Sequence, residues 1–429
     1  MPAGSSTDDP TGAIVAAWRA ESARLVGALT RMTRDVELAE DLAQDALVAA
    51  LEQWPATGVP ENPVAWLMTT AKRRGVDHFR RADSLRRKVA DLDHARLGEE
   101  EEVPDLDGQV DYIEDDVLRL IFLSCHPCLT AESRAALTLR LVGGLTTSEI
   151  ARGFLATEST MGQRISRAKK TLATAHARFE LPTGEERTRR LDDVMAVIYL
   201  IFNEGYTATA GEDWMRPALC DDALRLARVL EGLAPDEPEV HGLAALVEIQ
   251  ASRARARVRP DGTPILLLDQ NRALWDPLLI RRGLAALERS RGANGDAGPY
   301  ALQAAIAACH ARARVAADTD WPRIVMLYDE LARVTPSPVV ELNRAVAVSM
   351  ARGPAEALPL VDALADDPAL AEYHLLPAVR GDLLDRLGRR AEARVEFERA
   401  GALTRNSRER EVLLARAAAC AGEVTSARG

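Results

Sequence analysis

Residues 144–170 read GLTTSEIARGFLATESTMGQRISRAKK, and this stretch decides the fold of the region around it. We predict a helix that starts near Thr147, whose hydroxyl group can cap it. After a short break, a second helix begins at about Glu158. Its apolar residues recur at helical spacing and form one stripe, namely Met161, Ile165, Ala168 and Leu172. The polar and basic residues point away from that stripe. A helix, a turn and a basic second helix predict a helix-turn-helix, whose second helix enters the major groove of DNA.

Upstream, two further helices are predicted from the same periodicity. One spans about 36–54, buries Leu38, Leu42 and Ala46, and presents a mostly acidic outer face made of Glu37, Asp41, Gln44 and Asp45. The next starts at Asn62 as N-cap and Pro63 as first helical residue. It buries Val64, Leu67, Met68, Ala71 and Phe79, and it projects the basic side chains of Lys72, Arg73, Arg74, Arg80 and Arg81.

The composition extends this helical pattern to the whole chain. Ala, Leu and Arg dominate the 429 residues and only 4% are aromatic, which favours helices over strands. We therefore predict an all-α protein of several domains. The predicted parts are a compact helical domain at 11–82, an acidic flexible linker at 83–114, a helix-turn-helix domain at 115–182 and a helical domain at 187–429.

The net charge of −11 conceals two basic patches. Residues 91–116 hold twelve acidic side chains and one basic one, so this stretch alone carries −11. Residues 63–90 hold eight basic and two acidic side chains, and residues 163–178 hold five basic and none acidic. Basic surface of this kind is what contact with DNA phosphates requires.

The C-terminal part carries a repeat signal. Residues 373–404 fit one tetratricopeptide unit, and steps of 36 and 33 residues back from Phe397 reach Val361 and Tyr328. The matching steps from Ala400 reach Leu364 and Leu331, while small residues Ala345 and Gly381 stand where helices must cross closely. We predict stacked helical hairpins, whose concave surface binds a protein or peptide.

The sequence gives no sign of catalysis. It contains no phosphate-binding loop, no Gly-x-Ser-x-Gly elbow and no His-Glu-x-x-His motif, so we predict neither an enzyme nor a cofactor. Cys125 and Cys128 flank His126-Pro127, but no second Cys or His pair lies at metal spacing. We predict no metal site there and favour buried thiols.

Five scattered cysteines, no apolar signal segment and no apolar run longer than 197–202 indicate a cytoplasmic protein that does not enter a membrane.

Several segments resemble the extracytoplasmic-function (ECF) type of RNA polymerase sigma factor. Ala39–Leu47 is similar to the region-two helix of that family, and Trp66–Arg81 to its promoter minus-ten helix, although many members have Asn in place of Arg73. Gly144–Ala151 and Ser166–Lys170 are similar to its region-four helix-turn-helix. The resemblance covers about residues 11–180. The whole chain resembles the subgroup with a long tetratricopeptide-type tail.

The resemblance implies core RNA polymerase and promoter DNA as partners. Glu37, Asp41, Gln44 and Asp45 would dock on the β′ clamp helices, and the second domain would meet the β flap. The loop at 54–61 would lie near bases flipped from the minus-ten strand. The implied minus-ten contacts are Lys72, Arg73, Arg74, Asp77, Arg80 and Arg81; the implied minus-thirty-five contacts are Ser159, Thr160, Gln163, Arg164, Arg167 and Lys170. The acidic linker would follow the RNA exit path.

Some alternatives stay open at this point. Asp77 can instead pair with Arg73 or Arg81 along its helix. The linker is either a displaceable plug or a solubilising spacer. The protein as a whole can be a helix-turn-helix regulator that does not engage polymerase, or a repeat scaffold with a vestigial N-terminal half. The tail either regulates the N-terminal half or binds an unrelated partner.

Overall fold

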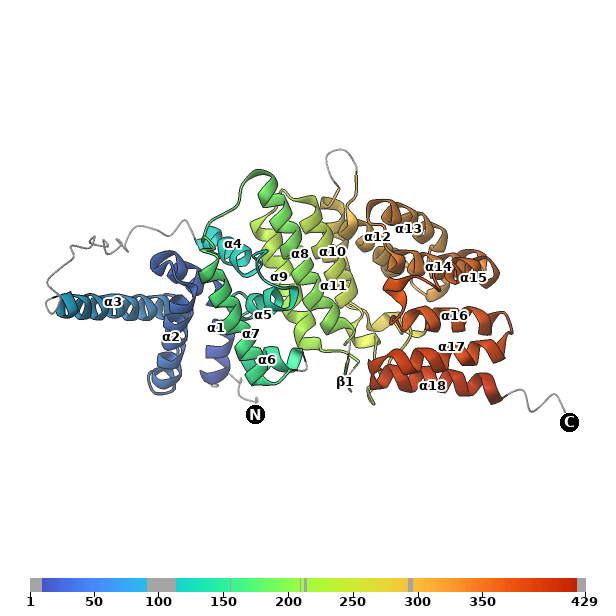
Figure 1. The fold of residues 1–429 in the computed structure, drawn as a ribbon, viewed down its shortest axis with the longest axis horizontal. Helices are drawn as coiled ribbons and strands as arrows, with labels where there is room; N and C mark the ends of the chain where they lie inside the picture. Colours follow the sequence, from blue (N-terminus) through green and yellow to red (C-terminus); the bar gives the residue numbers. More distant parts are fainter. Residues whose placement is uncertain are drawn as a thin grey trace, which may run out of the picture. The chain divides into compact units, whose positions relative to one another are not determined.

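The computed structural model describes residues 10–90, 113–154, 156–208, 210–211, 214–291 and 296–422. These residues form eighteen α-helices, a few 3₁₀ turns and one short parallel strand pair (Figure 1). The all-α prediction is confirmed. The chain divides into two compact units, Met1–Val197 and Ile198–Gly429, and the boundary falls inside helix α8 (Gly184–Tyr206). The predicted C-terminal boundary near residue 187 also lies within this helix.

The N-terminal unit contains seven complete helices and the first part of α8. They are α1 (Pro10–Thr33), α2 (Val36–Thr57), α3 (Pro63–Ala90), α4 (Ile113–Ser124), α5 (Ala131–Leu141), α6 (Thr147–Gly153) and α7 (Glu158–Thr174). Helices α2, α3 and α4 contact α1, and α5 and α6 contact α7. The core includes Trp54, Leu67, Leu120 and Leu137.

Local capping explains where these helices begin. The side chain of Asp35 accepts hydrogen bonds from the backbone N–H groups of Glu37 and Leu38, at 2.8 and 3.2 Å. Asn62 caps α3 by accepting from the N–H of Ala65 at 3.0 Å, so the predicted start of this helix is confirmed. Such caps satisfy N–H groups that have no partner within the helix.

Three predicted details differ from the structure. Thr146, not Thr147, caps α6: its hydroxyl accepts from the N–H of Glu149, whose carboxylate accepts from the N–H of Thr146. This reciprocal pair is a capping box. Helix α2 continues three residues beyond the predicted end and stops before Gly58, where φ is 81°. Leu38 of α2 and Met68 and Phe79 of α3 are half-buried and not fully in the core, while the side chain of Val64 lies outside the described residues.

The predicted linker is described only at its two ends. Helix α3 covers residues 83–90, and Asp116, within the acidic run, lies fully buried in α4. The Asp116 carboxylate forms ion pairs with Arg31 at 3.0 Å and Arg119 at 2.9 Å. The predicted flexible stretch 99–108 lies outside the described residues. Asp116 therefore belongs to a packed helix and not to a tether.

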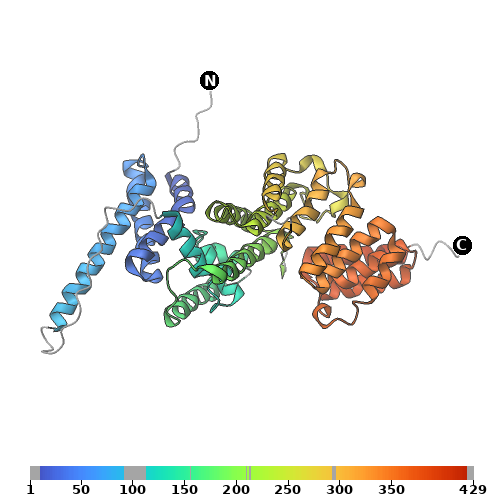
Figure 2. The same ribbon diagram turned by 90° about the horizontal axis from the view of Figure 1, so that it is seen from above.

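The C-terminal unit is built from helices α9 to α18 together with the last part of α8 (Figure 2). Their bounds are α9 (Pro217–Leu233), α10 (Pro238–Ala251), α11 (Pro277–Arg289), α12 (Pro299–Arg312), α13 (Trp321–Val334), α14 (Pro338–Arg352), α15 (Pro354–Asp362), α16 (Leu375–Arg386), α17 (Arg390–Leu403) and α18 (Ser407–Gly422). Strands β1 (Ala210–Gly211) and β2 (Arg405–Asn406) pair in parallel.

From α13 onward each helix contacts the next one along the chain. Leu331, Ala345, Val361, Phe397 and Ala400 are all buried in one core cluster, with Tyr328 and Leu364 packed against it. A Cβ atom at Gly381 would lie 2.9 Å from the Phe397 ring, so glycine lets these helices approach closely. The apolar positions predicted from the spacing are therefore core positions, while the assignment to tetratricopeptide repeats stays a prediction.

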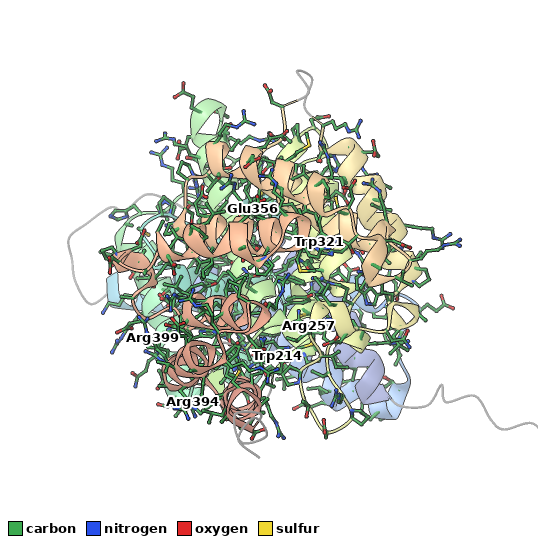
Figure 3. The ribbon with its side chains drawn as sticks, turned by 90° about the vertical axis from the view of Figure 1, so that its right-hand side faces the viewer. Trp214, Arg257, Trp321, Glu356, Arg394 and Arg399 are labelled. Carbon is green, nitrogen blue, oxygen red and sulfur yellow. The ribbon has the colours of Figure 1, made fainter. Side chains whose placement is uncertain are left out.

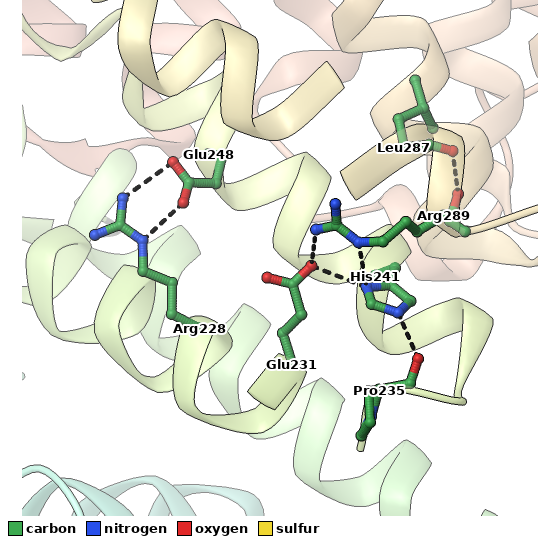
Figure 4. A network of polar contacts seen from close by, with 8 residues as sticks. Arg228, Glu231, Pro235, His241, Glu248, Leu287 and Arg289 are labelled. Atoms are coloured by element: carbon green, nitrogen blue, oxygen red, sulfur yellow. Dashed lines mark hydrogen bonds and ion pairs between the residues drawn. The ribbon is translucent and has the colours of Figure 1, made fainter. Parts of the chain in front are cut away.

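Helices α9, α10 and α11 are joined by ion pairs as well as by apolar contacts (Figure 4). Arg228 bonds the buried Glu248 through two nitrogens, at 2.7 and 3.1 Å. Glu231 accepts from Arg289 at 2.7 Å and lies 2.9 Å from His241 Nδ1, so the buried His241 is hydrogen-bonded within this network. Each arginine in this network has a carboxylate partner.

Candidate nucleic-acid and polymerase interface

Helix α3 presents the predicted basic face to solvent. Arg73, Asp77, Arg80 and Arg81 are exposed, whereas Lys72 and Arg74 are half-buried. Arg74 Nη1 forms an ion pair with Asp45 Oδ2 of α2 at 3.2 Å, which joins the basic face to the acidic one. Asp77 forms no ion pair with Arg73 or Arg81 among the described side chains, so the intrahelical alternative is not realised here. Contact of these residues with DNA stays a prediction.

The acidic outer face of α2 is also accessible. Glu37, Asp41 and Asp45 are exposed, and half-buried Gln44 donates a hydrogen bond from Nε2 to Glu40 Oε1 at 2.7 Å. Partial burial raises the pKa of Asp41, and the carboxylates of Glu40, Glu37 and Asp45 add to this, while Lys169 opposes it. A carboxylate surrounded by like charges is stabilised by an incoming cationic surface.

Sequence reasoning missed Glu40, which lies on the inner side of α2. It is only 4% exposed, and its two carboxylate oxygens meet Arg140 Nε of α5 and Lys169 Nζ of α7, each at 2.5 Å. One buried carboxylate thus joins the first domain to two helices of the second. The signal available in the sequence is an acidic residue between Ala39 and Leu42, on the apolar side of an amphipathic helix.

Trp18 makes a second contact between the two domains, because its indole N–H donates to the carbonyl oxygen of Gly144 at 3.0 Å. Gly144 lies in the turn before α6 with φ of 68°, and a Cβ atom there would meet the Ser22 side chain at 2.4 Å. The glycine is needed both for the turn and for the close approach of α1.

Helix α7 has the predicted form of a recognition helix. Thr157 caps it by accepting from the N–H of Thr160 at 3.1 Å. The predicted stripe is confirmed, since Met161, Ile165, Ala168 and Leu172 are all buried. The outward residues are exposed except for half-buried Arg164; they are Ser159, Thr160, Gln163, Arg167 and Lys170. Arg167 and Lys170 line a shallow hollow with Thr171, Thr174 and Ala175.

Cys125 and Cys128 do not form one site. Cys125 is buried beside the hydroxyl group of Thr138 at 3.4 Å, and burial raises the pKa of its thiol to about 11. Cys128 is exposed, so the prediction of buried thiols holds for Cys125 alone and is wrong for Cys128. Among the described residues no group of three or more His, Cys, Asp or Glu side chains is arranged to hold a metal.

Comparisons with known proteins agree with this geometry. Residues 17–85 match the sigma-70 region 2 family, and residues 119–172 match sigma-70 region 4. Residues 190–291 match a family of unknown function (DUF6596). An uncharacterized protein of Rhizobium meliloti is 45% identical over 93% of this chain and 94% of its own length.

The N-terminal part also matches named relatives. A probable ECF RNA polymerase sigma factor, SigI of Mycobacterium tuberculosis, is 29% identical over 42% of this chain and 61% of its own length. The ECF RNA polymerase sigma factor SigX of Bacillus subtilis is 25% identical over 38% of this chain and 84% of its own. The chain therefore contains the sigma-70 region 2 and region 4 domains.

The region 2 match covers most of α1 to α3, and the region 4 match covers the second half of α4, α5, α6 and nearly all of α7. The unassigned α8-to-α11 segment coincides with the family of unknown function. No solved structure matches the chain significantly. No helix in the described part of the chain is long and apolar enough to cross a membrane.

Proposed function

We propose that the protein is an ECF-type sigma factor that binds core RNA polymerase in the cytoplasm and directs transcription initiation at particular promoters. The observation that carries this proposal is the exposed acidic face of α2 beside the basic face of α3, joined by the Asp45–Arg74 ion pair. A helix-turn-helix regulator that never engages polymerase has no need of such a face. A repeat scaffold needs neither face.

In this proposal Glu37, Asp41, Gln44 and Asp45 dock on the β′ clamp helices, and the region 4 domain meets the β flap. Helix α3 reads the minus-ten element and α7 reads the minus-thirty-five element. The exposed position of Gln163 and the partial exposure of Arg164 support direct contact with base edges. Ser159 and Thr160, in the first turn of α7, suit a phosphate group.

Run-off transcription with purified core polymerase and a candidate upstream region tests the proposal. Asp41→Arg is expected to abolish or strongly reduce both polymerase binding and transcript, because it reverses a charge at the centre of the docking face. Glu180→Arg, an equally exposed charge reversal outside that face, is the matched control. Polymerase binding that is equal in the parent, Asp41→Arg and Glu180→Arg proteins would contradict the assignment of α2.

The contact through Glu40 suggests that the described arrangement is a closed form of the sigma factor. The two promoter elements lie roughly 25 base pairs apart, or about 85 Å of DNA at about 3.4 Å per base pair. Lys169 on the recognition helix cannot stay 2.5 Å from Glu40 of region 2 while both elements are read at once. Docking on polymerase must then break the Glu40 ion pairs.

We further propose that the C-terminal unit regulates the N-terminal domains through a tetratricopeptide-like surface that binds a protein or peptide. Cutting the chain after Glu180 and measuring transcription tests this. Higher activity of the short form indicates masking, and lower activity of a folded short form indicates assistance. Equal activity at all protein concentrations contradicts both.

The truncation needs a control, because α8 also stabilises the N-terminal unit. Arg190 donates to the carbonyl oxygen of Phe122 at 2.7 Å, and Asp193 pairs with Arg134 at 2.7 Å. Full-length Arg190→Ala loses the first contact and keeps the C-terminal unit. A change in transcription that is seen in the truncated form but not in Arg190→Ala is caused by loss of the C-terminal unit.

A further inference from the structure

Three arginines and three aromatic rings alternate inside the C-terminal unit, and we call them the arginine–aromatic cluster: Arg253, Arg257, Arg272, Tyr206, Trp214 and Trp275. The guanidinium carbon of Arg257 lies 3.3 Å from the Tyr206 ring centre and 6.0 Å from that of Trp214. Arg257 and Trp214 are labelled in Figure 3. Arg253 lies 5.7 Å from Tyr206 and 5.6 Å from Trp275. Arg272 lies 5.0 Å from Trp275. Shared rings therefore hold three positive charges close together.

The cluster is buried and its donors are poorly satisfied. Arg253 and Arg257 are 8% and 7% exposed. Arg253 makes no side-chain hydrogen bond to any described residue, and its buried Nε has no acceptor, nor have Arg272 Nε and Trp275 Nε1. Arg257 donates from Nη2 to the hydroxyl group of Thr207 at 3.1 Å. Unsatisfied buried donors are uncommon in folded proteins.

No carboxylate balances these charges at ion-pair distance in the described part of the unit. Arg272 instead donates to the Ala313 carbonyl at 2.8 Å and the Thr319 hydroxyl at 3.1 Å, and only exposed Asp318 acts on it as a more distant anion. Arg228 and Arg289 of the same unit do pair with glutamates. The cluster is thus an exception within its own unit.

The pKa values of Arg257 and His310 are lowered, in part by the neighbouring positive charges. Burial lowers the pKa of Arg257 to about 10, with Arg253 adding to the effect and Tyr206 opposing it. Burial lowers the pKa of His310 to about 4, and Arg253 and Arg272 add to that shift. The thiol of Cys220, which also acts on Arg257, has a pKa raised to about 12 by burial and stays neutral. Among the described residues no carboxylate lies within ion-pair distance of the three arginines, and Asp318 acts on Arg272 from further away.

Cation–π contact alone does not account for this arrangement. Such contacts stabilise by about 0.5–2 kcal/mol, whereas removing a cation from water costs several kcal/mol. A guanidinium group matches the two oxygens of a carboxylate or phosphate through parallel hydrogen bonds. We propose that the arginine–aromatic cluster binds a small ligand bearing a phosphate or carboxylate group, whose oxyanion accepts hydrogen bonds from Arg253 and Arg257. The C-terminal unit then contains a ligand site distinct from its helical-repeat surface.

The test is calorimetric melting of the full-length chain in phosphate, pyrophosphate or citrate, compared with sodium chloride of equal ionic strength. These anions stabilise proteins generally because they are excluded from the protein surface. The measured quantity is therefore the anion-induced rise in melting temperature of the parent minus that of Arg253→Met. We expect at least one of the three anions to raise the melting temperature of the parent by at least about 3 °C more than that of the variant. In chloride, Arg253→Met should melt at or above the parent temperature, because it removes an unpaired buried charge.

Two further variants keep the result interpretable. Arg257→Lys retains the charge but loses the planar fork, so its response to the effective anion should be intermediate. Arg228→Met, outside the cluster, should keep the full response although it loses an ion pair. An equal response of the parent and Arg253→Met to all three anions would overturn the proposal. So would an Arg253→Met protein that melts below the parent in chloride and responds normally, because that result assigns Arg253 a packing role only. The result does not depend on the proposed transcriptional function.

Discussion

In the N-terminal unit the buried carboxylate of Glu40 meets two cations, whereas in the C-terminal unit the buried guanidinium groups of Arg253 and Arg257 meet rings and, among the described residues, no carboxylate. The first arrangement is complete without a ligand and holds two domains of one unit together. The second leaves buried positive charge without a counter-charge from the described residues. The difference separates an internal contact, which we propose breaks when the protein docks on polymerase, from a cluster that we propose binds a ligand.

Removing the carboxylate from the N-terminal contact gives the largest expected effect. Glu40→Gln leaves Arg140 and Lys169 without their anion, and losing one partner of a buried pair costs about 3–5 kcal/mol. We expect a lower melting temperature of the N-terminal unit, measured by calorimetry. Because the same change loosens the closed form, transcription at limiting protein concentration should rise.

Glu52→Gln is the matched control, since Glu52 is exposed on the same helix outside the docking face, and its loss should change stability by less than about 0.5 kcal/mol. A stable Glu40→Gln protein with unchanged transcription would show that the ion pairs do not hold the two domains together.

On the C-terminal side, acid should destabilise the protein through His310. Its folded-state pKa is about 4, below the ordinary value of 6.5, so the unfolded chain binds a proton first as the pH falls. The stability that His310 contributes is complete above pH 6.5 and is lost as the pH falls towards 4. At pH 5 the expected loss is about 2 kcal/mol. His310→Gln should therefore lose less melting temperature than the parent between pH 7.5 and pH 5; equal losses would contradict the buried neutral state.

The sequence predicts best what depends on neighbouring residues. The Asn62 cap and the apolar stripe of α7 follow from spacing within one helix, and both are confirmed. The error at Thr147 was avoidable, because Glu149 stands three residues after Thr146, as a capping box requires. The Glu40–Arg140 pair joins residues 100 positions apart, and no local pattern encodes such a distance.

The arginine–aromatic cluster could not be predicted for a different reason. The alternating arginines of residues 253–257 have the pattern of a solvated surface, and their sequence spacing does not reveal that two of them are buried. Only the fold brings Tyr206 and Trp275 against them. The exposed arginines of α3 have the same chemistry and the opposite environment. Burial, which the sequence leaves open here, distinguishes the proposed DNA-binding surface from the proposed ligand site.

A smaller effect is expected at the exposed face of α7. Gln163→Ala and Arg164→Ala should change which promoters are selected, because contacts with base edges discriminate by roughly 1–3 kcal/mol. Half-buried Arg164 is expected at the lower end of this range, since part of the residue is already buried against the protein. Selection from a promoter library measures the change. An identical selected motif for the parent and both variants would contradict the assignment of α7 as the recognition helix.

The smallest expected effect is at Lys170, which is exposed at the hollow near the end of α7. A lysine ammonium group acts on DNA as a point charge, so Lys170→Ala should weaken binding to all promoters alike and leave the selected motif unchanged. Losing one phosphate contact should reduce the slope of log affinity against log salt by about one.

Lys169 is the informative comparison, because its ammonium group is already paired with Glu40 in the closed form. Lys169→Ala should release that contact and alter polymerase docking, whereas Lys170→Ala should alter only the salt dependence of DNA binding. Binding titrations at several salt concentrations, with and without polymerase, distinguish the two lysines. Equal behaviour of the two variants would show that Lys169 and Lys170 do not have the separate roles of domain contact and DNA contact.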